Sequence, residues 1–271
     1  MKRSPDVKRI ATDIDGTFAD PKKRITPATR EVLRALERRG VPVTCISGRC
    51  PRGMHPLLKD AGFHDVEYGS LNGAVILNAD GSVAAESRLG ARLARRAIAE
   101  FQSRGLDIYV FSSHEWYIVD PRPAHVEEEV RLLGFGPTLV PDFAPYLNET
   151  VKVVGVSDDH ALVEKAEREV GAVFGARASV ARASARFCDV NSPRGNKGTF
   201  IRFLRQRHGL SKRNVLTLGD MPSDARMFHW SIGVAMGNAP ESVKHKAYYV
   251  TASNAEDGWA RAVEELVLRR S

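Results

Sequence analysis

A short apolar stretch that ends in two aspartates constrains the fold of this chain most. Residues 7–17 run Val-Lys-Arg-Ile-Ala-Thr-Asp-Ile-Asp-Gly-Thr, which predicts a buried strand that stops at Asp13 and Asp15. Two carboxylates one residue apart repel each other, and a desolvated carboxylate needs a counter-charge or a proton. A divalent cation neutralises both, and open α/β sheets bind ligands at the carboxyl ends of their strands. The stretch therefore predicts a cation or ligand site at the edge of an α/β sheet.

The residues that follow predict a strand–helix–strand unit. Thr26 is a suitable N-cap, Pro27 suits the first helical position, and Gly40 suits the end of the helix. Residues 41–46 then form a second apolar strand. Such a unit has a right-handed crossover within a parallel sheet. The same alternation resumes after Lys197, with expected strands at 214–218, 231–235 and 247–250.

The middle of the chain has a different pattern. Helices are expected at 91–102, 125–133 and 158–170, and strands at 106–111, 116–119, 151–156 and 185–190. Pairs of strands with intervening helices predict an α+β unit with its own antiparallel sheet. We therefore expect a core formed by residues 1–83 and 188–271, with residues 84–187 inserted as a second domain.

Composition excludes several classes of protein. The 271 residues contain no apolar run of about 18 residues and no secretory signal after Met1, so we expect no membrane span and a cytoplasmic location. Three cysteines without a metal-binding spacing indicate reduced, buried thiols (Cys45, Cys50 and Cys188). The net charge of +7 suits either nucleic acid or a small anionic substrate. Because the basic residues are scattered, we expect a small phosphorylated substrate and no nucleic acid, with the protein a monomer or homodimer.

Four polar clusters fall at the ends of expected parallel strands or at a helix start. Each has an ordinary structural explanation alone, such as a cap, a turn or a surface lysine. The carboxyl ends of parallel strands share one edge, so residues distant in sequence can converge there. Together, carboxylates, a hydroxyl and an ammonium make a site for a hard cation and a phosphate. The clusters are Asp13 with Asp15, Ser47-Gly48-Arg49, Lys197, and Asp220 with Asp224.

These clusters also carry a family resemblance. Asp-Ile-Asp-Gly-Thr, Ile-Ser-Gly-Arg, Asn-Lys-Gly and Gly-Asp-x-x-Ser-Asp occur in this order along the chain. The set resembles the haloacid dehalogenase superfamily, and is most similar to the Cof-like phosphatases, which have a large inserted α/β cap. The resemblance implies a Rossmann-like parallel-sheet core with an α+β cap at residues 84–187 that contacts the leaving group.

The resemblance also implies a role for each residue. Asp13 is the expected nucleophile that forms an aspartyl-phosphate, and Asp15 is the expected proton donor and acceptor. A Mg²⁺ ion is expected on Asp13, Asp15 (through its main-chain carbonyl), Asp220 and Asp224. Ser47, the Gly48 amide and Lys197 are expected to hold the phosphoryl oxygens and to offset charge. The second acid beside the nucleophile favours phosphate chemistry over carbon–halogen chemistry.

Two alternatives stay open. A phosphomutase of the same fold would transfer the phosphoryl group to a sugar hydroxyl rather than to water. A catalytically weak cation- or phosphate-binding regulatory protein is the other, supported by Ser223, because the family commonly has asparagine at that position. Candidates for contacting the leaving group are Arg49, Asn72, His114, Trp116 and Arg186, although an ordinary structural role is the simpler interpretation of each.

Overall fold

The computed structural model describes residues 6–63, 65–120, 123–182 and 185–269 and divides the chain into two compact units. The first contains Met1–Gly48, Pro56–Ser82 and Asn196–Ser271, and the second contains Arg49–His55 and Val83–Gly195. The second unit thus extends beyond the boundary expected at residue 187, because the strand that follows pairs with other strands of the second unit. The assignment of residues 84–187 as a cap over a core stays a prediction.

A five-stranded sheet forms the centre of the first unit, in the order β14-β13-β12-β1-β2. Every pair in it is parallel, which confirms the predicted parallel α/β sheet. β1 lies between β12 and β2, and all four of its residues are buried. The strands are β1 (Arg9–Thr12), β2 (Val43–Cys45), β12 (Val215–Gly219), β13 (Ile232–Ala235) and β14 (Tyr249–Val250).

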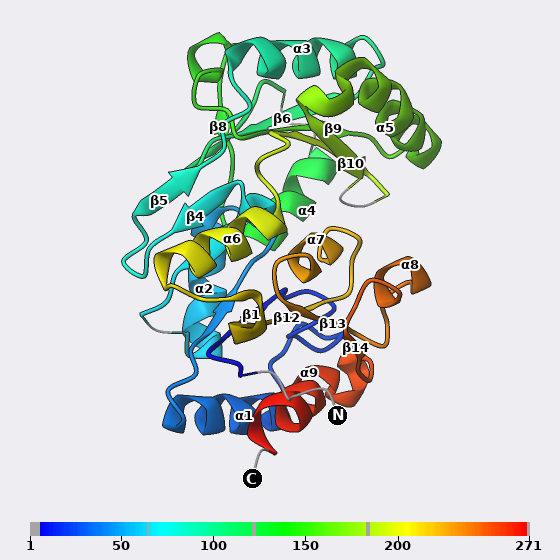
Figure 1. Ribbon diagram of the computed structural model, residues 1–271. Helices are drawn as coiled ribbons and strands as arrows, with labels where there is room; N and C mark the ends of the chain where they lie inside the picture. Colours follow the sequence, from blue (N-terminus) through cyan, green and yellow to red (C-terminus); the bar gives the residue numbers. More distant parts are fainter. Residues whose placement is uncertain (1–5, 64, 121–122, 183–184, 270–271) are drawn as a thin grey trace. The chain divides into compact units, whose positions relative to one another are not determined.

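Helices flank this sheet (Figure 1). α1 begins as the sequence predicts, because the Thr26 side chain accepts a hydrogen bond from the Thr29 amide and Pro27 is the first helical residue. α1 packs beside α9, whose Trp259 is buried in the same hydrophobic core as Leu36. The helices of this unit are α1 (Pro27–Arg38), α6 (Lys197–Arg207), α7 (Ala225–Phe228), α8 (Glu241–Lys244) and α9 (Gly258–Val263), which continues as a π-helical segment, Glu264–Leu268. α2 (Pro51–Ala61) begins in the second unit and belongs to the first from Pro56 on.

A short antiparallel strand pair lies beside β2 in the first unit. β3 (Tyr68–Ser70) pairs with β4 (Val75–Leu77), and a single 3₁₀ turn joins them. Leu71 and Asn72 in that turn both have positive φ angles, and the Asn72 amide donates to the Ser47 carbonyl at 2.8 Å. The turn therefore fixes the backbone of the loop that follows β2.

The second unit contains a six-stranded sheet in the order β10-β11-β9-β6-β7-β8. Its pairs are antiparallel, as predicted, except for β7 with β8, which is parallel. Apolar alternation did not predict β8, whose two residues are exposed, or the half-exposed edge strand β10. The elements are β5 (Val83–Glu86), α3 (Ala91–Gln102), β6 (Asp107–Phe111), β7 (Trp116–Ile118), α4 (Pro123–Leu133), β8 (Thr138–Leu139), β9 (Lys152–Val156), α5 (His160–Phe174), β10 (Ser179–Arg182) and β11 (Phe187–Asn191).

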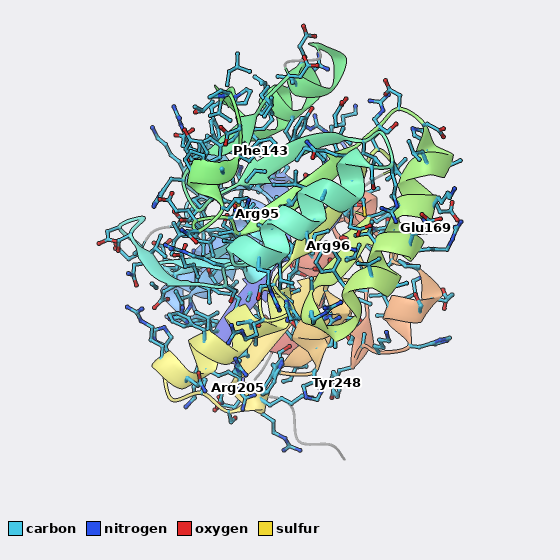
Figure 2. All side chains as sticks on the ribbon, turned by 90° about the horizontal axis from the view of Figure 1, so that it is seen from above. Arg95, Arg96, Phe143, Glu169, Arg205 and Tyr248 are labelled. Atoms are coloured by element: carbon cyan, nitrogen blue, oxygen red, sulfur yellow. The ribbon has the colours of Figure 1, made fainter. Side chains whose placement is uncertain are left out.

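α3 and α5 cover one face of this second sheet. Figure 2 shows the two helices side by side, with Arg95 and Arg96 on α3 and Glu169 on α5. Arg104, just after α3, joins them through a 3.0 Å ion pair to Glu169. Arg95 and Arg96 are exposed, so the basic stretch predicted on this helix is a solvated face. The apolar side of the helices packs on the strands through Phe101, Phe174 and their neighbours.

Candidate active site

The site is built on the carboxyl end of β1, where the backbone continues to bond to both neighbouring strands. The Asp13 amide donates to the Leu218 carbonyl of β12 at 3.0 Å, and the Ile46 amide after β2 donates to the Thr12 carbonyl at 2.9 Å. Thr12 is held in addition by the indole N–H of Trp259, at 3.1 Å, and donates its own hydroxyl hydrogen to the Asp13 carbonyl. Asp13 is therefore fixed at the centre of the sheet edge.

Lys197 joins Asp13 to Asp224. Its Nζ lies 2.7 Å from Oδ1 of Asp13 and 2.6 Å from Oδ1 of Asp224, and the lysine is only 3% exposed. Lys197 is the first residue of α6, and the Asn196 side chain caps that helix by accepting hydrogen bonds from the Gly198 and Thr199 amides. The helix start thus positions a buried ammonium between two carboxylates that lie far apart in sequence.

The loop after β12 holds the other two acids. Oδ2 of Asp224 accepts hydrogen bonds from the amides of Asp220 and Met221 at 3.0 and 2.8 Å. A side chain at Gly219 would overlap the Asp224 carboxylate, so glycine is required where β12 ends. Ser223 is exposed, and the bonds that hold Asp224 come from Lys197 and the backbone. The serine therefore leaves the placement of Asp224 intact.

Asp220 contacts the loop that follows β1. Its Oδ1 accepts a 2.7 Å hydrogen bond from the Thr17 hydroxyl. Gly16 has φ +83°, and a Cβ there would overlap the Asp220 carboxylate, so both its conformation and its lack of a side chain are needed. Asn238 completes this corner, donating from Nδ2 to the Gly16 carbonyl at 2.9 Å.

Three of the acids form a potential cation site. One oxygen from each of Asp13, Asp220 and Asp224 lies within 4.8 Å of the others, and all three residues are buried. Lys197 supplies one positive charge, which leaves two negative charges in excess when all three carboxylates are ionised. Carboxylate oxygens are the ligands that Mg²⁺ prefers, and a divalent cation balances this excess. The donor set therefore fits the predicted metal.

Burial dominates the electrostatics of the cluster. Desolvation raises the pKa of the Asp13 carboxyl, Lys197 opposes that rise, and the charges of Asp224 and Asp220 add to it. Desolvation likewise raises the pKa of Asp220, partly offset by the hydrogen bond from Thr17. For Lys197, desolvation opposes the charged form, but Asp13 and Asp224 outweigh it, so its pKa is raised. The lysine stays protonated and favours ionisation of the nucleophile candidate.

Asp15 occupies a different position from the three buried acids. Its carboxylate lies 2.6 Å from Nζ of Lys23, and its side chain is 32% exposed. Asp15 therefore has solvent access, which the Asp13 side chain at 8% exposure lacks almost entirely.

Ser47 and Gly48 follow β2 at the same edge of the sheet. Ser47 is buried, and its backbone amide donates to the Gly69 carbonyl at 3.0 Å. Gly48 lies next to the side-chain amide of Asn72. Asn72 is thus a structural support of this loop. Arg186, another candidate contact, is ion-paired with Asp158 at 3.1 Å.

Comparison with known proteins identifies the family. The family model for haloacid dehalogenase-like hydrolases matches residues 10–263, which is most of the chain. The chain belongs to the haloacid dehalogenase-like hydrolases. This confirms the resemblance drawn from the four motifs, and with it a Rossmann-like core carrying an additional α+β unit.

Relatives of this hydrolase are phosphatases by name. A Haemophilus influenzae protein with a provisional phosphatase name is 29% identical, over 95% of this chain and 97% of its own. The phosphoglycolate phosphatase of Methanobrevibacter smithii is 26% identical over 97% of this chain and 100% of its own. A solved haloacid dehalogenase-like hydrolase from Bacteroides thetaiotaomicron aligns with a TM-score of 0.84 at 27% identity, covering 96% of this chain and 99% of its own. A solved subclass IIB sugar phosphatase aligns with a TM-score of 0.81 at 26% identity, covering 96% of this chain and 98% of its own. The hydrolase is therefore a phosphoric monoester hydrolase of the Cof type.

Sequence reasoning missed three supporting residues of the hydrolase: Thr17, Asn238 and Trp259. Asn238 follows β13, so it lies at the same sheet edge as the predicted clusters, and that position was a usable signal. Thr17 ends the first motif, and its contact with Asp220 crosses 203 residues. Trp259 lies on the last helix, and no local pattern links it to Thr12.

Proposed function

We propose that this hydrolase is a Mg²⁺-dependent phosphatase that cleaves a small phosphomonoester through a phosphoaspartate on Asp13. One observation carries the proposal: a buried aspartate at the end of the central strand bonds to a buried lysine, within a cluster of three acids. The lysine favours the ionised carboxylate that nucleophilic attack requires.

In the first step, a carboxylate oxygen of Asp13 attacks phosphorus. The bond between phosphorus and the ester oxygen breaks, and Asp15 donates its proton to that leaving oxygen. The products of this step are the free alcohol and a phosphoryl group joined to Asp13. Asp15 suits the proton transfer because it is solvent-accessible, whereas Asp13 is buried.

In the second step, water attacks the phosphorus of the phosphoaspartate. Asp15, now ionised, takes a proton from the water as the new bond forms. The bond between phosphorus and the Asp13 oxygen breaks, which releases inorganic phosphate and restores both carboxyl groups to their starting states. Lys197 offsets negative charge at Asp13 throughout.

The metal and phosphate contacts follow from the same residues. Asp13, Asp220, Asp224 and the main-chain carbonyl of Asp15 would hold Mg²⁺. Bound there, the ion supplies positive charge that balances the carboxylates and the phosphoryl oxygens. Ser47, the Gly48 amide and Lys197 would hold the phosphoryl oxygens.

The proposed substrate is a small phosphorylated metabolite, and a sugar phosphate fits the observations best. The net charge of +7 suits an anionic substrate, and a structurally similar protein is named a sugar phosphatase. Another relative is named a phosphoglycolate phosphatase, so a carboxylated substrate is the main competitor within the class. We assign substrate selection to the inserted region, residues 84–187.

Hydrolysis of p-nitrophenyl phosphate by the purified protein tests the proposal. We expect turnover that requires Mg²⁺ and a loss of at least about 10³-fold in kcat for Asp13→Asn. Asp60→Asn is the matched control, because Asp60 is an exposed residue on α2 paired with Arg30. Equal turnover by wild type and Asp13→Asn would refute the proposal. Release of inorganic phosphate in proportion to nitrophenol separates hydrolysis from transfer to a sugar hydroxyl.

A further inference from the structure

A cavity of about 640 Å³ lies in the first unit, away from the candidate active site. Arg9 and Val43, the first residues of β1 and β2, line it, whereas Asp13 and Ser47 follow the opposite ends of the same strands. Its other walls are one face of α1 and the end of α2 with the turn after it. Cavities that bind small molecules have volumes of about 300–1,000 Å³, so this one is large enough for a ligand.

Apolar side chains form part of the cavity wall. Leu33 on α1, Val41 before β2 and Phe63 after α2 are half-buried. Each packs on the hydrophobic core of the first unit and also lines the cavity. Because burying exposed apolar surface is favourable, a concave apolar wall suits a ligand with an apolar body.

Arg9 carries an uncompensated charge at the buried side of the wall. It is 9% exposed, and among the described charged residues that line the cavity it alone is buried. Its Nη1 lies 3.0 Å from Oε2 of Glu67. Oε1 of the same carboxylate lies 3.0 Å from Nε of Arg207 and 3.0 Å from Nε2 of His208. Two guanidinium groups thus share one carboxylate, which leaves one positive charge in excess even when His208 is neutral.

The Arg9 guanidinium also has donors left for a ligand. Among the residues that the structure describes, Nη1 is the nitrogen of this side chain that makes a hydrogen bond. A guanidinium carries N–H groups on all three of its nitrogens and binds a carboxylate through two parallel hydrogen bonds. A carboxylate in the cavity would therefore meet both a fork of donors and the surplus charge.

The remaining charges of the wall balance in sign. They belong to three basic and three acidic residues: Arg30, Arg34, Lys59, Glu37, Asp60 and Asp65. The surplus at Arg9 is one positive charge, and a single carboxylate neutralises it. A phosphate dianion would add a second negative charge to a wall that already carries three acids.

We propose that this cavity binds a small organic monocarboxylate with an apolar body, and that Arg9 bonds its carboxylate. The apolar body would pack on Leu33, Val41 and Phe63. The inference is independent of the phosphatase proposal, because no residue of the candidate active site lines the cavity.

Amide NMR titration of the whole protein in EDTA tests this binding. The probes are phenylpropionate, phenylpropanol, which has the same body without the charge, and phenyl phosphate, which is a dianion. We expect phenylpropionate to shift the amide signals of Val41, Val43 and Phe63. It should bind about tenfold or more tightly than either of the other probes, because a hydrogen-bonded charge pair supplies the difference.

Two variants separate the charge from the shape of the cavity. Arg9→Met removes the guanidinium, and Glu67 keeps its bond to Arg207. Leu33→Trp fills the cavity and keeps Arg9. Arg38→Met is the control, because Arg38 is exposed on α1 outside the cavity. Each of the first two variants should weaken phenylpropionate binding about tenfold or more, and the control should change it less than about twofold.

Several results would overturn the inference. One is the absence of shifts at Val41, Val43 and Phe63 with phenylpropionate at roughly 10 mM. Equal affinity for phenylpropanol, or tighter binding of phenyl phosphate, would contradict the role given to the carboxylate. Shifts confined to the amides of Asp13 and Gly48 would place the probe in the candidate active site instead. Should Arg9→Met fail to fold, undiminished binding by Leu33→Trp would still overturn the inference.

Discussion

Replacing Lys197 with methionine tests the electrostatic design of the site. Methionine is close to lysine in length and carries no charge, so Lys197→Met removes the ammonium with little change in packing. The ammonium bonds Asp13 and Asp224 at 2.7 and 2.6 Å, and the lysine is 3% exposed. Its removal leaves three buried carboxylates within 4.8 Å without that counter-charge.

The expected cost is large for one substitution. Removing one partner of a buried ion pair costs about 3–5 kcal/mol, because the other charge stays buried and unpaired. For a chain of this size, we expect the melting temperature in EDTA to fall by roughly 6–20 °C. Differential scanning calorimetry measures the shift. Lys59→Met, an exposed position on α2, is the control and changes stability by less than about 0.5 kcal/mol.

Added Mg²⁺ sharpens the same test. A divalent cation on the carboxylates replaces part of the lost charge, so saturating Mg²⁺ raises the melting temperature of Lys197→Met more than that of wild type. Activity stays low in the variant because Asp13 loses its bonded cation. If Lys197→Met melts in EDTA within about 2 °C of the Lys59→Met control, the ammonium does not stabilise the buried carboxylates.

Three further substitutions test separate parts of the structure. Burial disfavours the charge of Glu67, but its backbone, Arg9 and His208 outweigh burial and lower its pKa. The ionised carboxylate therefore stabilises the protein above pH 4.5, and this contribution is lost as the pH falls. Glu67→Gln should therefore cost about 3 kcal/mol near pH 7 and less at acidic pH, measured by urea unfolding; a pH-independent difference contradicts this. Gly219→Ala places a Cβ against the Asp224 side chain. It should destabilise the protein by about 1–3 kcal/mol and reduce kcat at least about tenfold. An unchanged kcat would show that the loop adapts to the new side chain. Thr17→Val removes the bond to Asp220 and should weaken Mg²⁺ activation about 10-fold or more, seen as a higher half-saturating concentration, whereas an unchanged value excludes this supporting role.

The parallel core was predictable because its signals are local. Apolar strands that end in polar clusters and the Thr26-Pro27 helix start determine the order of elements without any distant contact. The convergence of Asp13, Lys197, Asp220 and Asp224 was also predictable, since parallel strands place their carboxyl ends on one edge.

Other features depend on contacts that local patterns do not encode. The strand β10 has one large apolar residue in four and lies at a sheet edge, so alternation is too weak to reveal it. Asp15 lies apart from the three buried acids and pairs with Lys23, eight residues away, a contact that the strand pattern does not encode. Support from Trp259 and Asn238 comes from packing between segments more than 200 residues apart.

Locating the phosphoryl group during turnover tests the assignment of Asp13 as the nucleophile most directly. The protein is mixed with substrate and Mg²⁺, quenched in acid within milliseconds to seconds, and digested for mass spectrometry. We expect one phosphoryl group on the peptide that contains Asp13, labile to hydroxylamine as an acyl phosphate, and none in Asp13→Asn. A phosphoryl group on another side chain, or undiminished hydrolysis by Asp13→Asn, would contradict it.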